Sequence, residues 1–193
     1  AHAREATLHG LFVALLEGSS PDDMLFLQIK QARRSVLARH IHGEAAWFER
    51  LSLEAFQSGL SWMTILRKRD NFRAAFAGFD PDRVAAFTES DVERLMSDVG
   101  IVRNRAKILA TIANAAAVVR LRGEGGLEAV IRAHTPDVRP SPEATTTPAT
   151  AALAAQLARH GFRFVGPTTM HALMQATGLF DPHVDECFRR SAP

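Results

Sequence analysis

The stretch Leu53-Glu-Ala-Phe-Gln-Ser-Gly-Leu-Ser-Trp62 places an acid, an amide and a large aromatic side chain close together in the chain. Glu54 and Gln57 lie three positions apart and would share one face of a helix. Gly59 permits a turn, and Ser61 is a good cap for a following helix. A carboxylate beside an indole can hold a flat cationic ligand, because the ring face attracts the cation and the carboxylate accepts its N–H groups. The stretch therefore predicts two helices that meet at a candidate binding site.

The pattern on both sides of this stretch is helical. Before it, Ala45, Phe48 and Leu51 continue an apolar stripe near the 3.6-residue period. After it, Asp80 followed by Pro81 indicates a helix cap with proline at the first helical position. Further helices are expected at 61–69, 84–87, 88–98, 103–122, 149–160 and 166–177, with an irregular loop at 134–148. Nothing after residue 44 requires a strand, so the predicted fold class is mainly α.

Residues 1–40 differ in hydrophobic pattern from the helical remainder of the chain. Two short apolar runs, 11–16 and 24–30, flank the turn-forming sequence Gly18-Ser-Ser-Pro-Asp-Asp23. This arrangement indicates a candidate short N-terminal β-hairpin. The predicted organisation is therefore an atypical, fusion-like segment at 1–40 and a helical domain at 41–190.

Composition limits the class of protein. The chain has 193 residues, 47% of them hydrophobic, and a net charge of +2, so it can build a core and carries no strong overall field. Cys187 is the single cysteine, which excludes an internal disulfide and fits a reducing cytoplasm. No apolar run reaches the length of a membrane span. The predicted location is cytoplasmic, without a membrane partner.

Three blocks of the chain resemble a known repair family. The first is Phe48-Glu-Arg-Leu-Ser-Leu-Glu-Ala-Phe-Gln-Ser-Gly-Leu-Ser-Trp-Met-Thr-Ile-Leu-Arg-Lys-Arg69, and the second is Asp98-Val-Gly-Ile-Val-Arg-Asn-Arg-Ala-Lys-Ile108. The third runs from Gly161-Phe-Arg-Phe-Val-Gly-Pro-Thr-Thr169 through Leu173-Met-Gln-Ala-Thr-Gly-Leu179. Together they are similar to DNA-3-methyladenine glycosylase I, over residues 42 to about 188.

The resemblance implies a helix-hairpin-helix DNA glycosylase fold. The hairpin would be Asp98-Val-Gly-Ile101, where a glycine turn and helix-end N–H groups can hold a DNA phosphate. Gly100, Arg103, Arg105 and Lys107 are the expected DNA-binding residues. The alternative is an ordinary connection between two helices, with basic clusters that only form solvated faces.

The implied activity is that of a monofunctional DNA glycosylase, which excises 3-methyladenine from alkylated double-stranded DNA in base-excision repair. It would act as a monomer. Glu54 is the expected catalytic residue and binds the flipped base, while Trp62 stacks on it. Gln57 and Leu60 correspond to side chains that fill the gap in the DNA, and His171 replaces a tyrosine of the pocket. The alternatives are structural: Glu54 as a cap or a buried acid paired with an arginine, and Trp62 as plain core.

A structural zinc ion is implied by the same resemblance, but half of its site is missing from the sequence. His183 and Cys187, at positions i and i+4, match two ligands. The positions expected for the family's N-terminal tyrosine and zinc-binding histidine hold Ala32 and Arg33. Two ligands of four leave a zinc site open, so we expect impaired glycosylase activity. The alternative function is a catalytically inactive DNA-binding or structural remnant.

Overall fold

The computed structural model describes residues 41–141 and 143–180, all within a compact unit that spans Ala38–Pro193. This part of the chain is helical and contains no strand, which confirms the predicted mainly α fold. The candidate β-hairpin within residues 1–40 lies outside the described residues, so the domain boundary near residue 40 stays a prediction. No helix in the described ranges is both long enough and apolar enough to cross a membrane.

The helices follow one another with short connections. They are α3 (Glu44–Gln57), α4 (Trp62–Arg67), α5 (Arg69–Ala75), η1 (Ala77–Phe79), α6 (Pro81–Ala85), α7 (Glu89–Ser97), α8 (Arg105–Leu121), η2 (Arg122–Glu124), α9 (Gly126–Arg132), α10 (Pro148–Arg159) and α11 (Pro167–Ala176).

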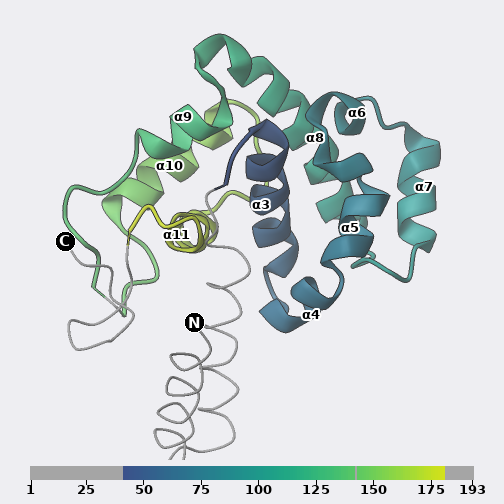
Figure 1. The fold of residues 1–193 in the computed structure, drawn as a ribbon, viewed down its shortest axis with the longest axis horizontal. Helices are drawn as coiled ribbons and strands as arrows, with labels where there is room; N and C mark the ends of the chain where they lie inside the picture. The colour runs from purple at the N-terminus through teal and green to yellow at the C-terminus, as the bar shows by residue number, and fades with distance from the viewer. Residues whose placement is uncertain (1–40, 142, 181–193) are drawn as a thin grey trace, which may run out of the picture. The chain divides into compact units, whose positions relative to one another are not determined.

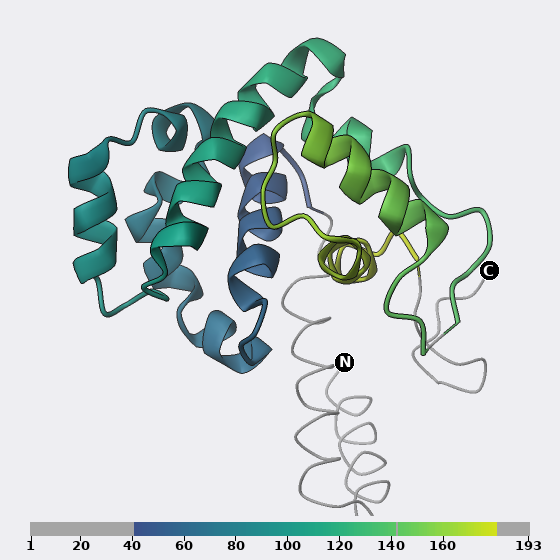
Figure 2. The same cartoon turned by 180° about the vertical axis from the view of Figure 1, so that it is seen from behind.

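Helix α3 occupies the middle of this unit. Helices α6 and α8 pack against each other on one side of it, and α9 and α11 contact it on the other (Figure 1). Helix α10 covers α11, as the view from behind also shows (Figure 2). The residues Glu54 to Ser61 at the end of α3 are therefore supported by a helix that is packed on both sides.

A cluster of phenylalanine rings forms the core beneath α3. Phe76 lies with its ring centroid 5.5 Å from that of Phe79, 5.9 Å from Phe56, 6.2 Å from Phe72 and 6.3 Å from Phe87. The side chain of Phe76 is fully buried. Since burial of an aromatic ring removes a large apolar area from water, this cluster is a main source of the stability of the α3–α5 region.

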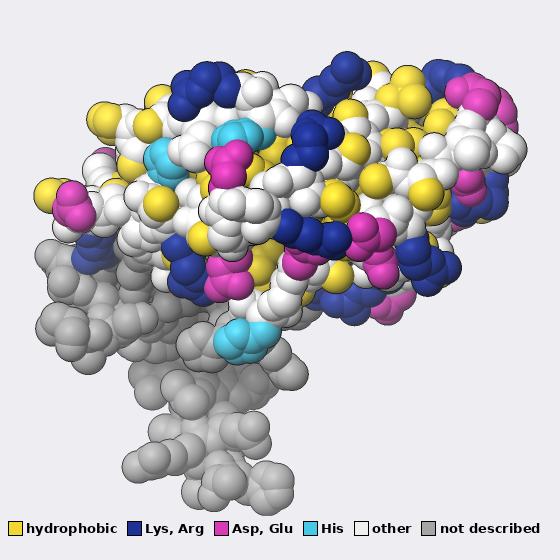
Figure 3. All heavy atoms as spheres, turned by 90° about the horizontal axis from the view of Figure 1, so that it is seen from above, with side chains coloured by type: hydrophobic (Ala, Val, Ile, Leu, Met, Phe, Trp, Pro, Cys, Tyr) yellow, Lys and Arg dark blue, Asp and Glu magenta, His cyan; other side chains and the backbone are white. Residues whose placement is uncertain are grey.

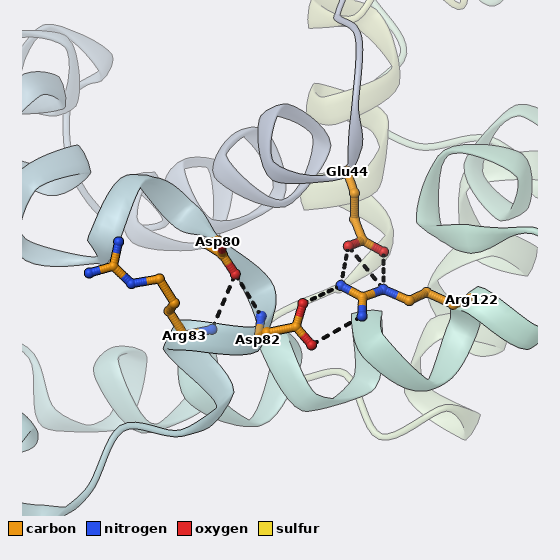
Figure 4. Close-up of polar contacts among 5 residues, drawn as sticks. All are labelled: Glu44, Asp80, Asp82, Arg83 and Arg122. Atoms are coloured by element: carbon orange, nitrogen blue, oxygen red, sulfur yellow. Dashed lines mark hydrogen bonds and ion pairs between the residues drawn. The ribbon is translucent and has the colours of Figure 1, made fainter.

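Two of the predicted helix caps are confirmed. The Ser61 hydroxyl accepts a hydrogen bond from the backbone N–H of Thr64 at the start of α4. The Asp80 carboxylate accepts from the N–H groups of Asp82 and Arg83, with Pro81 at the first position of α6 (Figure 4). Such short-range bonds depend on residues two or three positions apart, which is why sequence alone can find them.

The helix expected at 61–69 corresponds to α4 alone, and the following helix α5 was not predicted. Lys68 leaves helical geometry (φ −99°, ψ 1°), and its N–H closes the end of α4 by bonding to Ile65 and Leu66. Helix α5 then starts at Arg69 in a new direction. Helix α9 was also absent from the prediction, which placed only a helix end at Gly123 to Gly126.

Arg122 joins three helices near the far end of α8. Its guanidinium donates to both oxygens of Glu44, at the start of α3, and to both oxygens of Asp82, in the first turn of α6 (Figure 4). The Nη2 atom lies 2.6 Å from each carboxylate. Acids in a first helical turn and a cation after a last turn also complement the helix dipoles.

The ion pair with Arg122 predicts a pH-dependent contribution to stability. The hydrogen bond from Arg122 lowers the pKa of Asp82 below its ordinary value of 3.8. A carboxylate with a lowered folded-state pKa stabilises the fold above its unfolded pKa, and this contribution is lost as the pH falls through the lowered value. We expect Asp82→Asn to melt below the unchanged protein at pH 6, and the difference to shrink steadily below pH 3.8. Calorimetry across this range is the measurement.

Asp137→Asn, which changes an exposed acid outside the cluster, is the control. A difference in melting temperature between Asp82→Asn and the unchanged protein that stayed constant with pH would contradict the argument.

Candidate base-binding site and DNA interface

Glu54 and Trp62 face a common partner, Arg50. Arg50 lies one turn before Glu54 on α3, and its Nη2 atom donates to Oε1 of Glu54 at 2.6 Å. The guanidinium carbon lies 4.8 Å from the centroid of the Trp62 ring. The structural alternative for Glu54, a buried acid paired with an arginine, is therefore confirmed. The acid and the indole thus both contact the planar guanidinium of Arg50, and their binding of a ligand stays a prediction.

The Glu54 and Trp62 side chains are enclosed in this structure. Their exposed fractions are 1% and 5%, and that of Arg50 is 2%. An ion pair at this depth is costly to disturb, because each buried charge would lose a close counter-charge. A base can reach the pair only if the surrounding structure opens locally.

The turn between α3 and α4 is exposed and lies next to this pair. Gly59 adopts a positive φ of 81°, which permits the tight reversal. The Gln57 amide donates to the backbone carbonyl of Leu60 at 2.8 Å and closes the turn. The Leu60 side chain is 39% exposed. The two predicted gap-filling residues are therefore together on one projecting turn.

The predicted hairpin lies between α7 and α8. The Asp98 carboxylate accepts from the N–H of Gly100 at 2.7 Å, and Asn104 caps α8 by accepting from the N–H of Lys107. A Cβ atom on Gly100 would lie 2.9 Å from the Asp98 carboxylate and 3.1 Å from the Asn71 side chain, so a larger residue would displace both side-chain ends. Val99, at the tip, is 73% exposed.

The three basic residues of the hairpin have different surroundings. Arg103 is exposed. Arg105 donates to Glu89 and Glu93, and these hydrogen bonds, that of Glu93 first, raise its pKa. Lys107 is only 8% exposed, and its ammonium donates to the carbonyls of Phe56 and Ser58. The three basic residues are therefore close in sequence but differ in their contacts. Among the contacts that the structure describes, only Arg103 is exposed and has no acidic partner.

His171 is buried on α11, and its ring centroid lies 4.9 Å from that of Phe180. Helix α11 packs against α3, the helix that carries Glu54. The predicted substrate-binding residue is thus on an element adjacent to the base site.

The predicted zinc ligands His183 and Cys187 lie outside the described residues. Within 41–141 and 143–180, no group of three or more His, Cys, Asp or Glu side chains could hold a metal ion.

Charged side chains of both signs are mixed on the surface. Figure 3 shows one face on which Lys and Arg side chains alternate with Asp and Glu and with scattered apolar groups. This agrees with the net charge of +2. This face therefore carries no large single-sign field of the kind that attracts nucleic acid.

Sequence reasoning missed Arg50, Lys68 and Asn71. Arg50 could have been found, since it lies four positions before Glu54 and i,i+4 pairs of opposite charge face each other on a helix. Lys68 and Asn71 contact the hairpin across about thirty residues of chain, at Val99 and Gly100. No local pattern encodes that contact.

Comparisons with known proteins agree with this geometry. The methyladenine glycosylase family model matches residues 37–190. DNA-3-methyladenine glycosylase 1 of Escherichia coli (strain K12) is 46% identical over 148 residues, which cover 72% of this chain and 79% of that protein. The DNA-3-methyladenine glycosylase of Haemophilus influenzae is 39% identical over 150 residues, covering 72% and 80%.

Solved structures give the same result. A crystal structure of 3-methyladenine DNA glycosylase I (TAG) superposes with a TM-score of 0.75 at 38% identity, covering 84% of this chain and 94% of that one. A structure of 3-methyladenine DNA glycosylase I from Staphylococcus aureus, solved to explain 3-methyladenine recognition, superposes with a TM-score of 0.74 at 28% identity, covering 82% and 89%. The resemblance seen in the sequence and the helix-hairpin-helix fold that it implied are confirmed.

Proposed function

The chain belongs to the methyladenine glycosylase family, and on that premise we propose that it removes 3-methyladenine from alkylated double-stranded DNA. It is a DNA-3-methyladenine glycosylase, a hydrolase of N-glycosyl bonds, and it acts in base-excision repair. The observation that carries the assignment of the base site is the planar Arg50 cation held between Glu54 and Trp62.

The substrate makes modest chemical demands. Adenine methylated at N3 is positively charged while it is attached to the sugar, and cleavage of the glycosidic bond releases it as a neutral base. The leaving group is already activated, so the protein does not have to protonate it. Its task is to flip the nucleotide out of the stack, to recognise the charged ring and to place it for attack by water.

Glu54 and Trp62 are suited to that task. A flat cationic ring over an indole gains about 2 kcal/mol when desolvated, while neutral adenine gains less. The Glu54 carboxylate accepts hydrogen bonds from the N–H groups of the base and offsets its charge. The base would take the place in which Arg50 is now seen, and the guanidinium would shift as the site opens. His171, on the neighbouring helix, would line the same pocket.

The DNA backbone would be held at the hairpin. The Gly100 turn allows a close approach of a phosphate, and Arg103 supplies an exposed cation. Leu60 and Gln57, on the exposed turn between α3 and α4, would fill the gap left by the flipped nucleotide. Arg105 contributes less, since Glu89 and Glu93 already neutralise it.

The zinc ion that the family resemblance implies is structural and would take no direct part in these chemical steps. His183 and Cys187 have the right chemistry for zinc but form half of a ligand set, which would bind the metal weakly. Elemental analysis of the purified protein is therefore expected to give well under one zinc per chain. We further propose that the protein acts as a monomer. We propose a cytoplasmic location as well, since a single cysteine suits a reducing compartment.

The test is release of free base from methylated duplex DNA, measured by chromatography. We expect 3-methyladenine to appear with the purified protein, at a rate below that of the Escherichia coli relative in the same assay. The slower rate follows from the incomplete zinc site and the missing pocket tyrosine. No release from a folded sample, together with salt-dependent binding of undamaged DNA, would instead favour the inactive DNA-binding remnant.

A further inference from the structure

Lys107 connects the DNA-binding hairpin to the turn that carries Gln57 and Leu60. It lies in the first turn of α8, yet its side chain points away from solvent. Its Nζ donates to the carbonyl of Phe56 at 2.9 Å and to that of Ser58 at 2.6 Å. Both carbonyls belong to the last turn of α3, where backbone acceptors lack helical partners and the dipole is negative.

Two further bonds hold the hairpin itself. Lys68, between α4 and α5, donates its Nζ to the carbonyl of Val99 at 2.7 Å. Asn71 donates to the carbonyl of Gly100 at 3.2 Å, and a Cβ atom on that glycine would lie only 3.1 Å from the Asn71 side chain. The hairpin is thus fastened at its tip and at the start of α8 to the elements on either side of the Gln57–Leu60 turn.

The surroundings of Lys107 are those of an internal strut rather than a phosphate ligand. Two of its three N–H donors are used by carbonyl oxygens, and burial lowers its pKa. A lysine that binds a phosphate needs its ammonium group exposed, as Arg103 has its guanidinium. Lys107 was expected from sequence to contact DNA, and its position favours a different role.

We propose that Lys107 is a positioning residue, which fixes the Gln57–Leu60 turn relative to the hairpin so that phosphate binding places the turn at the flipped nucleotide. The inference rests on the proposed glycosylase function and deepens it. Lys68 and Asn71 support the same register from the other side. Because a misplacement of about 1 Å can slow an enzyme by about 100-fold, loss of this strut affects the excision step more than DNA binding.

The experiment compares Lys107→Met with Lys107→Arg. Excision of 3-methyladenine is measured in single turnover at saturating methylated DNA, and binding of undamaged duplex is measured across a range of salt. Arg120→Met is the matched control, since Arg120 is also a cation on α8 that donates to a backbone carbonyl, that of His160, far from the hairpin. Melting temperatures are recorded for every variant.

The expected result is a fall of about tenfold or more in the excision rate of Lys107→Met, with recovery in Lys107→Arg and no change in Arg120→Met. The slope of log affinity against log salt stays as in the unchanged protein. A slope smaller by about 0.9, with the saturated rate unaltered, would make Lys107 a phosphate contact and overturn the inference. So would an unaltered rate and slope.

If Lys107→Met does not fold, the same measurements are made on Lys68→Met. That substitution lies at an exposed hydrogen bond and removes only the bond from Lys68 to the carbonyl of Val99. A slower excision rate at saturation supports the inference, and an unaltered one overturns it. The two proposals fail in different ways. An unchanged protein that releases no 3-methyladenine defeats the proposed function, whereas an active protein with an equally active Lys107→Met defeats only the positioning role.

Discussion

Glu54→Gln is expected to slow release of 3-methyladenine from methylated DNA on the order of 100-fold at saturating substrate. The change removes the negative charge that offsets the cationic base, together with the ion pair between Glu54 and the buried Arg50 guanidinium. Two unit charges about 4 Å apart interact by about 4 kcal/mol at an effective dielectric constant of 20, so loss of the carboxylate charge would weaken the hold on a cationic base. Loss of one preorganised electrostatic group from an enzyme site has a cost of this order.

The control for this experiment is Glu49→Gln on the same helix. Glu49 is also a buried acid, but it bonds to Arg69 and Arg73 of α5 and not to the base site. It tests the general cost of removing a buried charge from α3, which can reach a few kcal/mol of folding stability. We expect Glu49→Gln to lower stability but to retain the excision rate of its folded fraction. A folded Glu54→Gln with an unaltered rate would remove Glu54 from the mechanism.

Phe76→Ala is expected to reduce the free energy of unfolding by about 3–5 kcal/mol. The ring is fully buried and packs against four other phenylalanine rings from α3, α5, η1 and the segment after α6. Removal of a buried ring costs its transfer free energy plus that of the cavity it leaves, and a cluster held by several elements cannot easily collapse to fill the space. Urea unfolding followed by circular dichroism measures the change.

Phe164→Ala is the matched control for Phe76. Phe164 is 42% exposed, so the same chemical change removes far less buried area. We expect a shift in stability within about 0.5 kcal/mol, as for most surface substitutions. Equal losses for the two variants would show that the ring cluster does not hold the α3–α5 region together.

The sequence was sufficient for the elements whose causes are local. The caps at Ser61 and Asp80 and the end of the long helix near Gly123 depend on residues a few positions apart, so their patterns predict them. The end of α4 was predicted to within two residues, but the helix that follows it, Arg69–Ala75, was not predicted. The short helix Gly126–Arg132 was missed as well: helices of this length are stable mainly through packing on their neighbours.

The candidate site likewise combines features that follow from local sequence with features that depend on tertiary packing. Glu54, Gln57 and Leu60 could be grouped into one candidate site because one stretch of sequence contains them. Lys107 was expected at the DNA because it belongs to a basic run, yet its ammonium lies on backbone oxygens about fifty positions earlier in the chain. Whether a basic residue near a turn meets solvent or another helix depends on tertiary packing, and no spacing rule contains that information.

The distribution of aromatic residues has a practical consequence. The chain has two tryptophans and no tyrosine. Trp62 lies at the candidate base site, where the Arg50 guanidinium packs over its ring. Trp47 lies elsewhere, under the guanidinium of Arg132 at the end of α9. The intrinsic fluorescence of the protein therefore arises from two indoles alone, one of which touches the residues that would receive the damaged base. In a Trp47→Phe background the emission would become a label-free signal of site occupancy.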